Sequence, residues 1–544
     1  MKRLILLGDW LWKVSRETRC GLLLCCLAVL LHAGFSMYFI HVCKILVDIA
    51  TGRLLLDFHL YAWVMVFCVI SLIILSVGKG YLSARNDIRI RNALRYGMFV
   101  RLSGMGYESR MRYHSGDILS RLTEDVRVTA YTLSRSFPAF VSSSARFTLA
   151  FAYLFYLDIR LAWIILTVLP VCLLLSKFSV REIRRLTFSI RQDDSKVQAF
   201  LQESFQHLFL LQVFERKEWM KKQLNILQEN LYRWEMKRSR ISVFSGLMVM
   251  CAFSGGYAVA FLWGVHGIYT GTVTFGMLTA FLQLIGQIQH PLADLGRQLP
   301  ALVHATASID RLRELEDDVV EMKFVPLHLS RRLGIRFRHV SFCYPGASRY
   351  ILKQFNYDFR PGSRTAISGV TGTGKTTLFR LILSLLRPQE GEILLYDKEG
   401  REVQVSSSTL CNLIYVPQGN TLWSGTIREN LLLGNPDATE KDMYWALKTA
   451  VAEFVFELPE GLETLCAEQG GGLSEGQAQR IAIARALLRK GSIYLFDELS
   501  SSLDEKTEES LIQNIITNLP GSTMLFITHR RRIADYCDDM LTIG

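Results

Sequence analysis

Hydrophobic residues divide the chain into two parts with different patterns. The first part has six long apolar runs, of about the length at which a helix crosses ~30 Å of hydrocarbon. These runs are 21–43, 60–78, 136–157, 161–176, 241–265 and 272–293. The run at 161–176 is short and needs the long side chain of Lys177 to reach the interface. The pattern predicts an all-α membrane domain with six transmembrane helices.

Two long stretches, 79–135 and 177–240, connect successive runs on one side of the predicted bundle. Each has few Gly or Pro residues and recurring apolar positions, which favours helices that continue well beyond the bilayer. We predict that each pair of helices ends in a short crossing segment, near 113–125 and near 202–215. Helices that only cap the bundle are the alternative.

After about residue 317 the apolar runs shorten to the length of strands. They occur at 335–340, 365–368, 393–396, 413–416, 493–496 and 523–527, with helical stretches between them. This alternation predicts an α/β domain with a mainly parallel sheet. The predicted organisation is therefore a membrane domain at 1–317 and an α/β P-loop domain at 318–544.

The charge distribution gives the predicted domains an orientation. The chain carries 62 Lys and Arg against 50 Asp and Glu, a net charge of +12. Thirty of these basic residues lie in 1–20, 79–135 and 177–240, and three lie in the opposite loops at 44–59, 158–160 and 266–271. The positive-inside rule then places the N-terminus, both long stretches and the α/β domain in the cytoplasm. A nucleic-acid partner is disfavoured, and the eleven cysteines show no metal-ligand spacing.

The strongest chemical motif is the glycine-rich segment at 369–376, GVTGTGKT, between a predicted strand and a predicted helix. Glycines let backbone N–H groups turn toward phosphate oxygens, and the helix N-terminus adds positive potential. In such a loop Lys375 reaches the β- and γ-phosphates and Thr376 binds Mg²⁺. The motif predicts an ATP site.

A second motif lies 121 residues after Thr376, where an apolar strand ends in Asp497 and Glu498. An acid beside a phosphate loop can hold Mg²⁺ through water, and the next acid can polarise the attacking water. We therefore expect Asp497 to act at the metal and Glu498 to act on water.

Together these segments resemble the ATP-binding cassette (ABC) transporters, specifically exporter-type half-transporters. VPQ at 416–418 resembles the Q-loop, LSEGQ at 473–477 the signature and SSLD at 501–504 the D-loop. ITH at 527–529 resembles the switch-histidine loop, and FCYP at 342–345 the segment whose aromatic residue stacks on adenine. This order and spacing covers nearly the whole chain.

The resemblance implies a role for each matching residue. Catalytic roles fall to Glu498, His529 and Gln418, and the Mg²⁺ ligands would be Thr376, Gln418 and Asp497. Contacts to ATP would come from Tyr344, Gly369, Gly372, Gly374, Lys375, Thr376, Thr377, Ser474, Gly476, Gln477 and Asp504. Since Ser474 would bind ATP held by the opposite cassette, a second half-transporter is the implied partner. Segments near Gly116, Asp117 and Glu203 would be the coupling helices.

One residue departs from the family pattern, because Glu475 replaces the first glycine of the usual LSGGQ. Ser474 and Gln477 are spaced as a capping box, with Ser474 as the N-cap of the following helix. Glu475 would then be the first helical residue, where the helix dipole favours an acid. We expect its carboxylate to point outward and the backbone to remain available to ATP.

Polar residues within the predicted membrane spans bear on the substrate. Gln283, Gln287, His290 and Asp294 share one face of the last helix, which suggests either a wall of the transport path or interhelical hydrogen bonds. Arg146 also has two interpretations: its side chain lines a cavity, or it extends to the membrane interface. For His32 and His41 we expect packing or interfacial roles, with contact to the substrate as the alternative.

The sequence thus predicts an ATP-driven transporter that exports a small or amphipathic substrate by alternating access as a dimer. We expect it in a bacterial inner membrane, in contact with lipid and with the cofactors ATP and Mg²⁺. An importer with an exporter-like fold is one alternative. An ATP-gated channel or regulator is another, although Glu498 argues against it. The sequence does not identify the substrate or decide between a homodimer and a heterodimer.

Overall fold

The computed structural model describes most of the chain. Residues 1–9, 11, 13–15, 17, 112, 114, 318–324, 330–331, 345, 348, 371, 467–471, 500–502, 529 and 544 lie outside the described part, as do the side chains of 108, 115, 168–180, 297, 299–300, 304 and 531. The chain forms two compact units. One comprises Met1–Val100 and Ser115–Asp317, and the other comprises Arg101–His114 and Asp318–Gly544.

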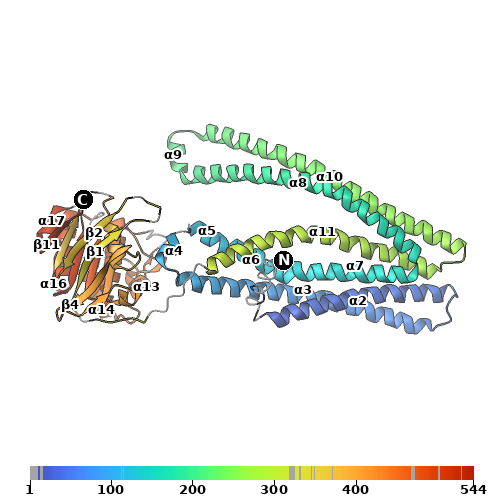
Figure 1. Cartoon of the computed structure of the whole chain (residues 1–544), viewed down its shortest axis with the longest axis horizontal. Helices are drawn as coiled ribbons and strands as arrows, with labels where there is room; N and C mark the ends of the chain where they lie inside the picture. Colours follow the sequence, from blue (N-terminus) through green and yellow to red (C-terminus); the bar gives the residue numbers. More distant parts are fainter. Residues whose placement is uncertain are drawn as a thin grey trace. The chain divides into compact units, whose positions relative to one another are not determined.

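The first unit is a bundle of long helices that lie lengthwise beside one another (Figure 1). The six long helices are α2 (Arg19–Ala50), α3 (Phe58–Ser103), α7 (Phe137–Leu157), α8 (Ile159–Gln206), α10 (Lys217–Tyr269) and α11 (Phe275–Asp317). Each covers all or nearly all of one of the six apolar runs. Short α5 (Ser115–Ser120), η1 (Arg121–Asp125), α6 (Val126–Tyr131) and η2 (Thr132–Ser136) lead into α7.

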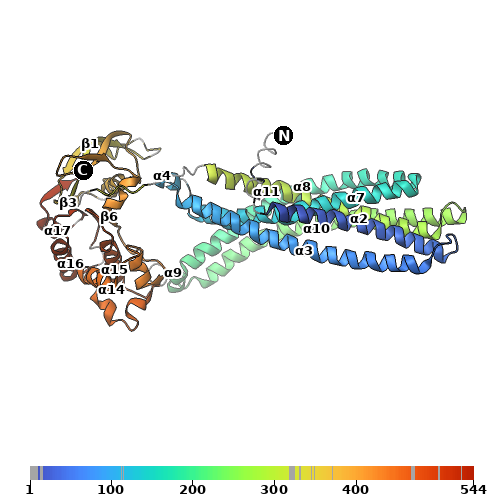
Figure 2. The ribbon, with the colours of Figure 1, turned by 90° about the horizontal axis from the view of Figure 1, so that it is seen from below.

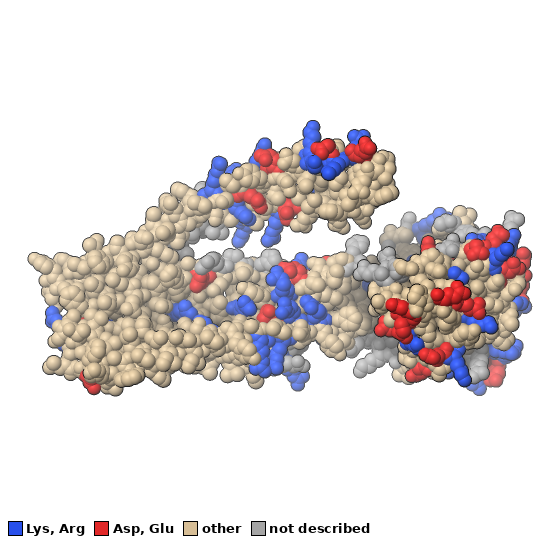
Figure 3. Space-filling model, turned by 180° about the vertical axis from the view of Figure 1, so that it is seen from behind, with Lys and Arg blue, Asp and Glu red and all other residues tan. Residues whose placement is uncertain are grey.

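The surface of this bundle fits a bilayer. Among the described residues, four helical segments are long and apolar enough to span a membrane: Arg19–Ala50, Phe58–Ser103, Gly116–Leu157 and Lys217–Tyr269. One half of the bundle shows almost no charged side chains on the face drawn in Figure 3. Many large apolar side chains of this bundle are exposed, for example Phe67 and Leu262. A contiguous exposed apolar surface of this kind needs lipid as its solvent.

One end of the bundle is closed by an apolar cluster that includes Leu154, Phe281 and Leu284. Asp158 is the N-cap of α8, where its side chain accepts hydrogen bonds from the N–H groups of Arg160 and Leu161. The same carboxylate accepts a 2.8 Å hydrogen bond from Trp263 Nε1 of α10. These contacts fix the helices at the end where α8 begins.

At the opposite end, the helices continue beyond the apolar region as predicted. α8 and α10 lie side by side and are joined by the short α9 (Leu208–Val213), which falls within the predicted crossing segment 202–215 (Figures 1 and 2). The first crossing segment was predicted wrongly at 113–125. The short helix there is α4 (Tyr107–Met111), and residues 115–125 already form α5 and η1. Pattern analysis missed α4 because five residues are too few for a helical period to appear.

The second unit contains a parallel and an antiparallel sheet. The parallel sheet has the order β11-β3-β10-β9-β6, from β3 (Arg364–Ser368), β6 (Leu413–Val416), β9 (Ile493–Asp497), β10 (Thr523–Ile527) and β11 (Asp539–Thr542). The antiparallel sheet has the order β2-β1-β4-β5, from β1 (Leu333–Phe342), β2 (Leu352–Phe359), β4 (Glu390–Asp397) and β5 (Glu402–Gln404). Assigning 335–340 and 393–396 to a mainly parallel sheet was therefore wrong.

Helices complete this unit. α12 (Lys375–Ile382) follows β3, and α13 (Ile427–Leu432), α14 (Glu440–Thr449), α15 (Glu475–Leu487), α16 (Glu505–Asn518) and α17 (Arg531–Asp535) follow in sequence. A small pair, β7 (Gly425–Thr426) and β8 (Leu465–Cys466), precedes α13 and α15. Two apolar cores hold the domain, one between the sheets and α12 and the other around α13 to α16. Figure 2 shows α14, α15 and α16 grouped on one side of the domain.

Candidate nucleotide-binding site

The glycine-rich loop lies where β3 ends and α12 begins. Gly369, Gly372 and Gly374 have φ values of 155°, 89° and 101°, which side chains rarely adopt. A Cβ at Gly369 would collide with the carbonyl oxygen of Ile543, and one at Gly374 with the side chain of Ile351. The fold therefore requires glycine at both positions, and the loop takes the turn that presents backbone N–H groups to an anion.

Lys375 lies across this loop at the first position of α12. Its Nζ donates hydrogen bonds to the carbonyl oxygens of Gly369, at 2.8 Å, and Val370, at 3.1 Å. The residue is 6% exposed, so its charge is directed at the loop rather than at solvent. Phosphate oxygens in the loop would lie beside this ammonium group.

Two of the three predicted Mg²⁺ ligands, Thr376 and Asp497, lie together although they are far apart in the sequence. Asp497 ends β9 next to β10 and β6. It interacts by hydrogen bonds with Thr376 and with Tyr415, whose hydroxyl donates to Oδ2 at 3.1 Å. Burial raises the pKa of the Asp497 carboxyl, and the two hydrogen bonds oppose the shift. Carboxylate, hydroxyl and amide oxygens are the ligands that Mg²⁺ prefers.

Replacing Asp497 with asparagine should make the nucleotide-free protein more stable at neutral pH. Because the folded-state pKa is raised, the charged carboxyl destabilises the fold above that pKa, and this effect disappears as the carboxyl becomes protonated in acid. We expect Asp497→Asn to gain on the order of 1 kcal/mol at pH 7. The gain should vanish toward pH 3 to 4, near the ordinary aspartate pKa of ~3.9.

The measurement is thermal unfolding of the solubilised full chain across pH without Mg²⁺ or nucleotide. The exposed Asp437→Asn is the control and should change little. A wild-type protein that is more stable than Asp497→Asn at pH 7 would contradict this account.

Glu498 is placed by an unusual backbone conformation directly after Asp497. It has a φ of 52°, in the left-handed region, and its N–H donates to the carbonyl oxygen of Ile527. Its carboxylate accepts a 2.6 Å hydrogen bond from Gln418 Nε2, the residue two positions after β6. From α15, Gln479 donates to the Glu498 carbonyl oxygen. Strain of this kind is typical of functional positions.

Tyr344 lies over the first turn of α12 and joins a small network. Its hydroxyl lies 3.1 Å from Thr377 Oγ1 and accepts a hydrogen bond from Arg380 at 3.0 Å. The Arg380 guanidinium also lies 5.9 Å from the centre of the Tyr107 ring in α4. Through Arg380, the aromatic residue predicted to stack on adenine is therefore linked to the segment Arg101–His114, which packs with this unit.

The signature segment forms the predicted capping box. Ser474 is the N-cap of α15, where its Oγ accepts from Gln477 N at 3.2 Å and its N–H donates to Gln477 Oε1 at 2.9 Å. Glu475 is the first residue of the helix and is exposed, as expected. The Glu475 carboxylate therefore faces solvent. The backbone N–H of Gly476 lies in the first turn of the helix.

Replacing Glu475 with glycine should change maximal ATPase activity by less than about fivefold. The reason is that Glu475 neither forms the capping box nor turns inward. The measurement is ATPase activity of the purified protein, with Glu475→Gln as the control that keeps the side-chain size. A rise of about a hundredfold in Glu475→Gly would show that the glutamate impairs this signature.

Of the remaining predicted site residues, some are described by the structure and others are not. Asp504 is the N-cap of α16, and hydrogen bonds with the side chain and the N–H of Thr507 lower the Asp504 pKa. His529 and residues 501–502 lie outside the described part of the chain. The roles proposed for all these side chains remain predictions.

Three neighbours of the site were not predicted from the sequence. Tyr415 contacts Asp497, Gln479 contacts the Glu498 backbone, and Arg380 links Tyr344 to α4. A tyrosine in a strand and an arginine in a helix are both common, so the residue types of Tyr415 and Arg380 gave no signal of a role at the site. Gln479 was recognisable as part of the segment after the signature, but its partner was not.

Comparisons with known proteins cover both units. The family "ABC transporter transmembrane region" matches residues 22–292, and the family "ABC transporter" matches residues 352–501. A fatty acid ABC transporter ATP-binding/permease protein of Mycobacterium tuberculosis is 30% identical over 502 residues, which is 91% of this chain and 76% of that protein.

Two other matches agree with these families. The uncharacterized ABC transporter ATP-binding protein YfiB of Bacillus subtilis is 28% identical over 89% of this chain and 85% of its own length. The solved structure of a bacterial Atm1-family ABC exporter with ATP bound aligns with a TM-score of 0.80 and 22% identity. The alignment covers 97% of this chain and 94% of that chain.

Proposed function

Since this chain belongs to the ABC transporter family, we propose that it is an exporter of small or amphipathic molecules that works as a dimer. The chain is an integral membrane protein that couples ATP hydrolysis to transport. Direction, substrate and partner are the proposed parts. The observation that carries the proposal is the meeting of Thr376, Asp497, Gln418 and Glu498 beside the phosphate loop, in a chain that also forms a membrane bundle.

The oxygen ligands around the phosphate loop fit Mg²⁺. Thr376 and the Asp497 carboxylate are already in contact, and Gln418 donates to Glu498 through its amide nitrogen. The Gln418 amide oxygen is a further oxygen ligand of the same kind. When bound with ATP, Mg²⁺ would neutralise charge on the phosphates.

Glu498 is the proposed base that orients the attacking water. Its carboxylate accepts a 2.6 Å hydrogen bond from Gln418 Nε2. For the Glu498 carboxylate to accept a proton from water, Gln418 must either break its hydrogen bond to that carboxylate or share the carboxylate with the water. We propose that ATP binding shifts Gln418 and so makes the hydrolytic group available only when nucleotide is present.

Each ATP is proposed to lie between two chains. Ser474 and the start of α15 form an exposed helix N-terminus, a natural partner for a phosphate. In the proposed dimer this N-terminus meets the ATP held by Lys375 of the partner chain. Closure around two ATP molecules, followed by hydrolysis and reopening, would drive alternating access.

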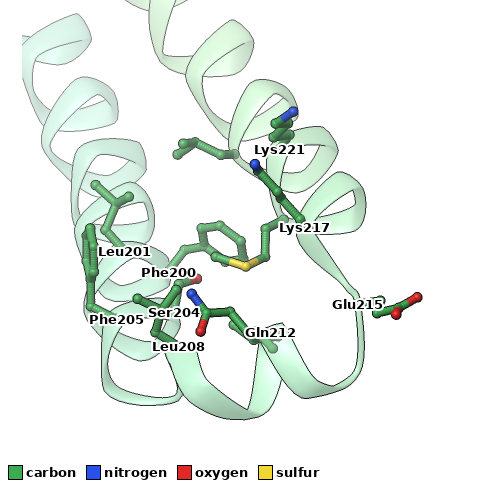
Figure 4. A pocket seen from close by; sticks show the side chains of 12 residues that line it. Phe200, Leu201, Ser204, Phe205, Leu208, Gln212, Glu215, Lys217 and Lys221 are labelled. Carbon is green, nitrogen blue, oxygen red and sulfur yellow. The ribbon is translucent and has the colours of Figure 1, made fainter.

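The turn between α8 and α10 is the proposed coupling segment. Its tip exposes Phe205, Phe209 and Phe214, and the turn encloses an apolar cavity of about 630 Å³ (Figure 4).

Transport into inverted membrane vesicles tests the proposed direction. An exporter should accumulate a labelled substrate inside inverted vesicles on addition of ATP, and vesicles with Glu498→Gln should not. Uptake into right-side-out vesicles instead would indicate an importer. An ohmic current that outlasts ATP turnover would indicate a channel.

A further inference from the structure

Four of the membrane helices carry charged or titratable side chains that lie close enough to interact. His32 of α2 interacts electrostatically with Lys79 of α3 and Arg146 of α7, and Lys79 interacts with Arg146. Asp294 of α11 interacts with Arg146. We call His32, Lys79, Arg146 and Asp294 the intramembrane cluster. Helices α2, α7 and α11 pack directly against one another.

Two members of the cluster, His32 and Arg146, lie at the depth of the hydrocarbon core. With a rise of about 1.5 Å per residue, Arg146 is about 14 Å from the start of α7 at Phe137, close to the middle of a ~30 Å core. By the same rise, His32 is about 16 Å from the start of its apolar run. Lys79 and Asp294 lie just past the ends of their apolar runs, about 28 and 33 Å from the opposite end of each run, so they lie at the membrane interface on the side where α2 begins.

The charges in this cluster are incompletely balanced. Among the described residues, neither Lys79 nor Arg146 forms a salt bridge, and Asp294 is the acid that interacts with Arg146. His32 Nδ1, Arg146 Nε and Gln298 Oε1 are shielded from solvent and have no hydrogen-bond partner. Ionisable side chains at this depth are costly and generally serve a ligand or an ion path.

The neighbouring face of α11 agrees with a ligand path. Gln283, Gln287 and Asp294 are half-buried and His290 is exposed, whereas Phe281, Leu284 and Ile288 on the other face are buried in the apolar cluster. Gln289, which lies off the polar face, donates a hydrogen bond to the Phe253 carbonyl oxygen of α10. On the polar face, Gln283 hydrogen-bonds with Cys43 of α2, so this face serves helix packing at Gln283.

We propose that the intramembrane cluster binds the anionic head group of an amphipathic substrate, such as a carboxylate, phosphate or sulfate. The proposal rests on the proposed transport function and specifies its substrate class. Lys79 and Arg146 would supply the positive charge and His32 a hydrogen bond, while the apolar part of the substrate contacts the surrounding hydrophobic side chains. A cationic amphiphile would meet two like charges in a medium of low dielectric constant.

The test is equilibrium binding of amphiphiles with equal chains to the full-length protein in phosphatidylcholine nanodiscs. The probes are radiolabelled dodecyl phosphate and dodecyltrimethylammonium. We expect dodecyl phosphate to bind at least tenfold more tightly. Equal binding of the two probes, or preference for the cation, would overturn the proposal.

Inorganic phosphate distinguishes a lipid-like substrate from a free anion. We expect millimolar inorganic phosphate to compete poorly with dodecyl phosphate, because it lacks the apolar part. Competition as strong as that of unlabelled dodecyl phosphate would overturn the amphipathic part of the proposal.

Substitutions within the intramembrane cluster test whether dodecyl phosphate binds at these residues. Lys79→Gln combined with Arg146→Gln should weaken dodecyl phosphate binding at least tenfold and leave dodecyltrimethylammonium binding unchanged or tighter. Arg146→Lys should retain most of the binding, which controls for folding. Arg160→Gln, at the opposite end of the bundle, is the matched control and should have no effect.

Basal ATPase activity separates this proposal from the proposed function. Preserved ATPase with no charge preference would reject the cluster as an anion site and leave the transporter assignment intact. Loss of both probes to the same extent in the double variant would also reject it. Absent ATPase in the wild-type protein would instead reject the proposed function.

Discussion

Glu498→Gln should lower the rate of ATP hydrolysis roughly 10²–10⁴-fold while ATP still binds. The glutamate follows Asp497, is held at a φ of 52° and lies within hydrogen-bonding distance of Gln418. The amide has nearly the same shape but cannot accept a proton from water. Lys375, Thr376 and Asp497 remain in place, so binding is retained and the closed dimer should accumulate.

Steady-state ATPase and filter binding of radiolabelled ATP, both on purified protein, measure these two effects. Glu453→Gln, at an exposed glutamate of the same domain, is the control and should behave as wild type. Near-normal hydrolysis by Glu498→Gln would remove Glu498 from the catalytic role.

Lys375→Ala should weaken ATP binding itself, by about 10- to 100-fold. The Lys375 ammonium is buried at the loop and bonds to the carbonyl oxygens of Gly369 and Val370. Phosphate oxygens would replace those partners, and hydrogen bonds to charged groups contribute about 1.5–3 kcal/mol each. Turnover then falls because the site is empty, in contrast to Glu498→Gln.

Equilibrium binding of a fluorescent ATP analogue gives the dissociation constant for this comparison. Lys398→Ala removes an exposed lysine of the same domain and is the matched control. An unchanged dissociation constant in Lys375→Ala, with the fold intact, would show that this lysine does not contact ATP.

Local sequence rules account for the parts of the site that were predicted. The glycine-rich loop needs φ values that only glycine adopts easily, and the Ser474 capping box needs only a partner three residues further along the chain. Both features are encoded within a few neighbouring residues, so the sequence alone could indicate them. The exposed position of Glu475 followed from the same capping geometry.

Contacts between distant segments could not be predicted in the same way. The Gln418–Glu498 bond joins residues 80 positions apart, and the Tyr415–Asp497 bond depends on β6 pairing with β9. The pairing of β1 with β2 and β4 in a separate sheet also depends on partners that periodicity does not specify. The short α4 and its contact with Arg380 depend on tertiary packing alone.

The central claim is that each ATP is shared by two chains, and a mixing experiment tests it most directly. Ser474→Arg removes the signature contact and Lys375→Ala removes the phosphate contact, so each variant alone should fail to trap ATP. A dimer of one Ser474→Arg chain and one Lys375→Ala chain has one site in which Lys375 and Ser474 are both intact, on different chains.

Differently tagged variants are expressed together, purified through both tags and assayed for tightly trapped radiolabelled ATP. The account predicts that the mixed dimer traps ATP although neither parent does. Mixed dimers that form but trap no more ATP than either parent would contradict it.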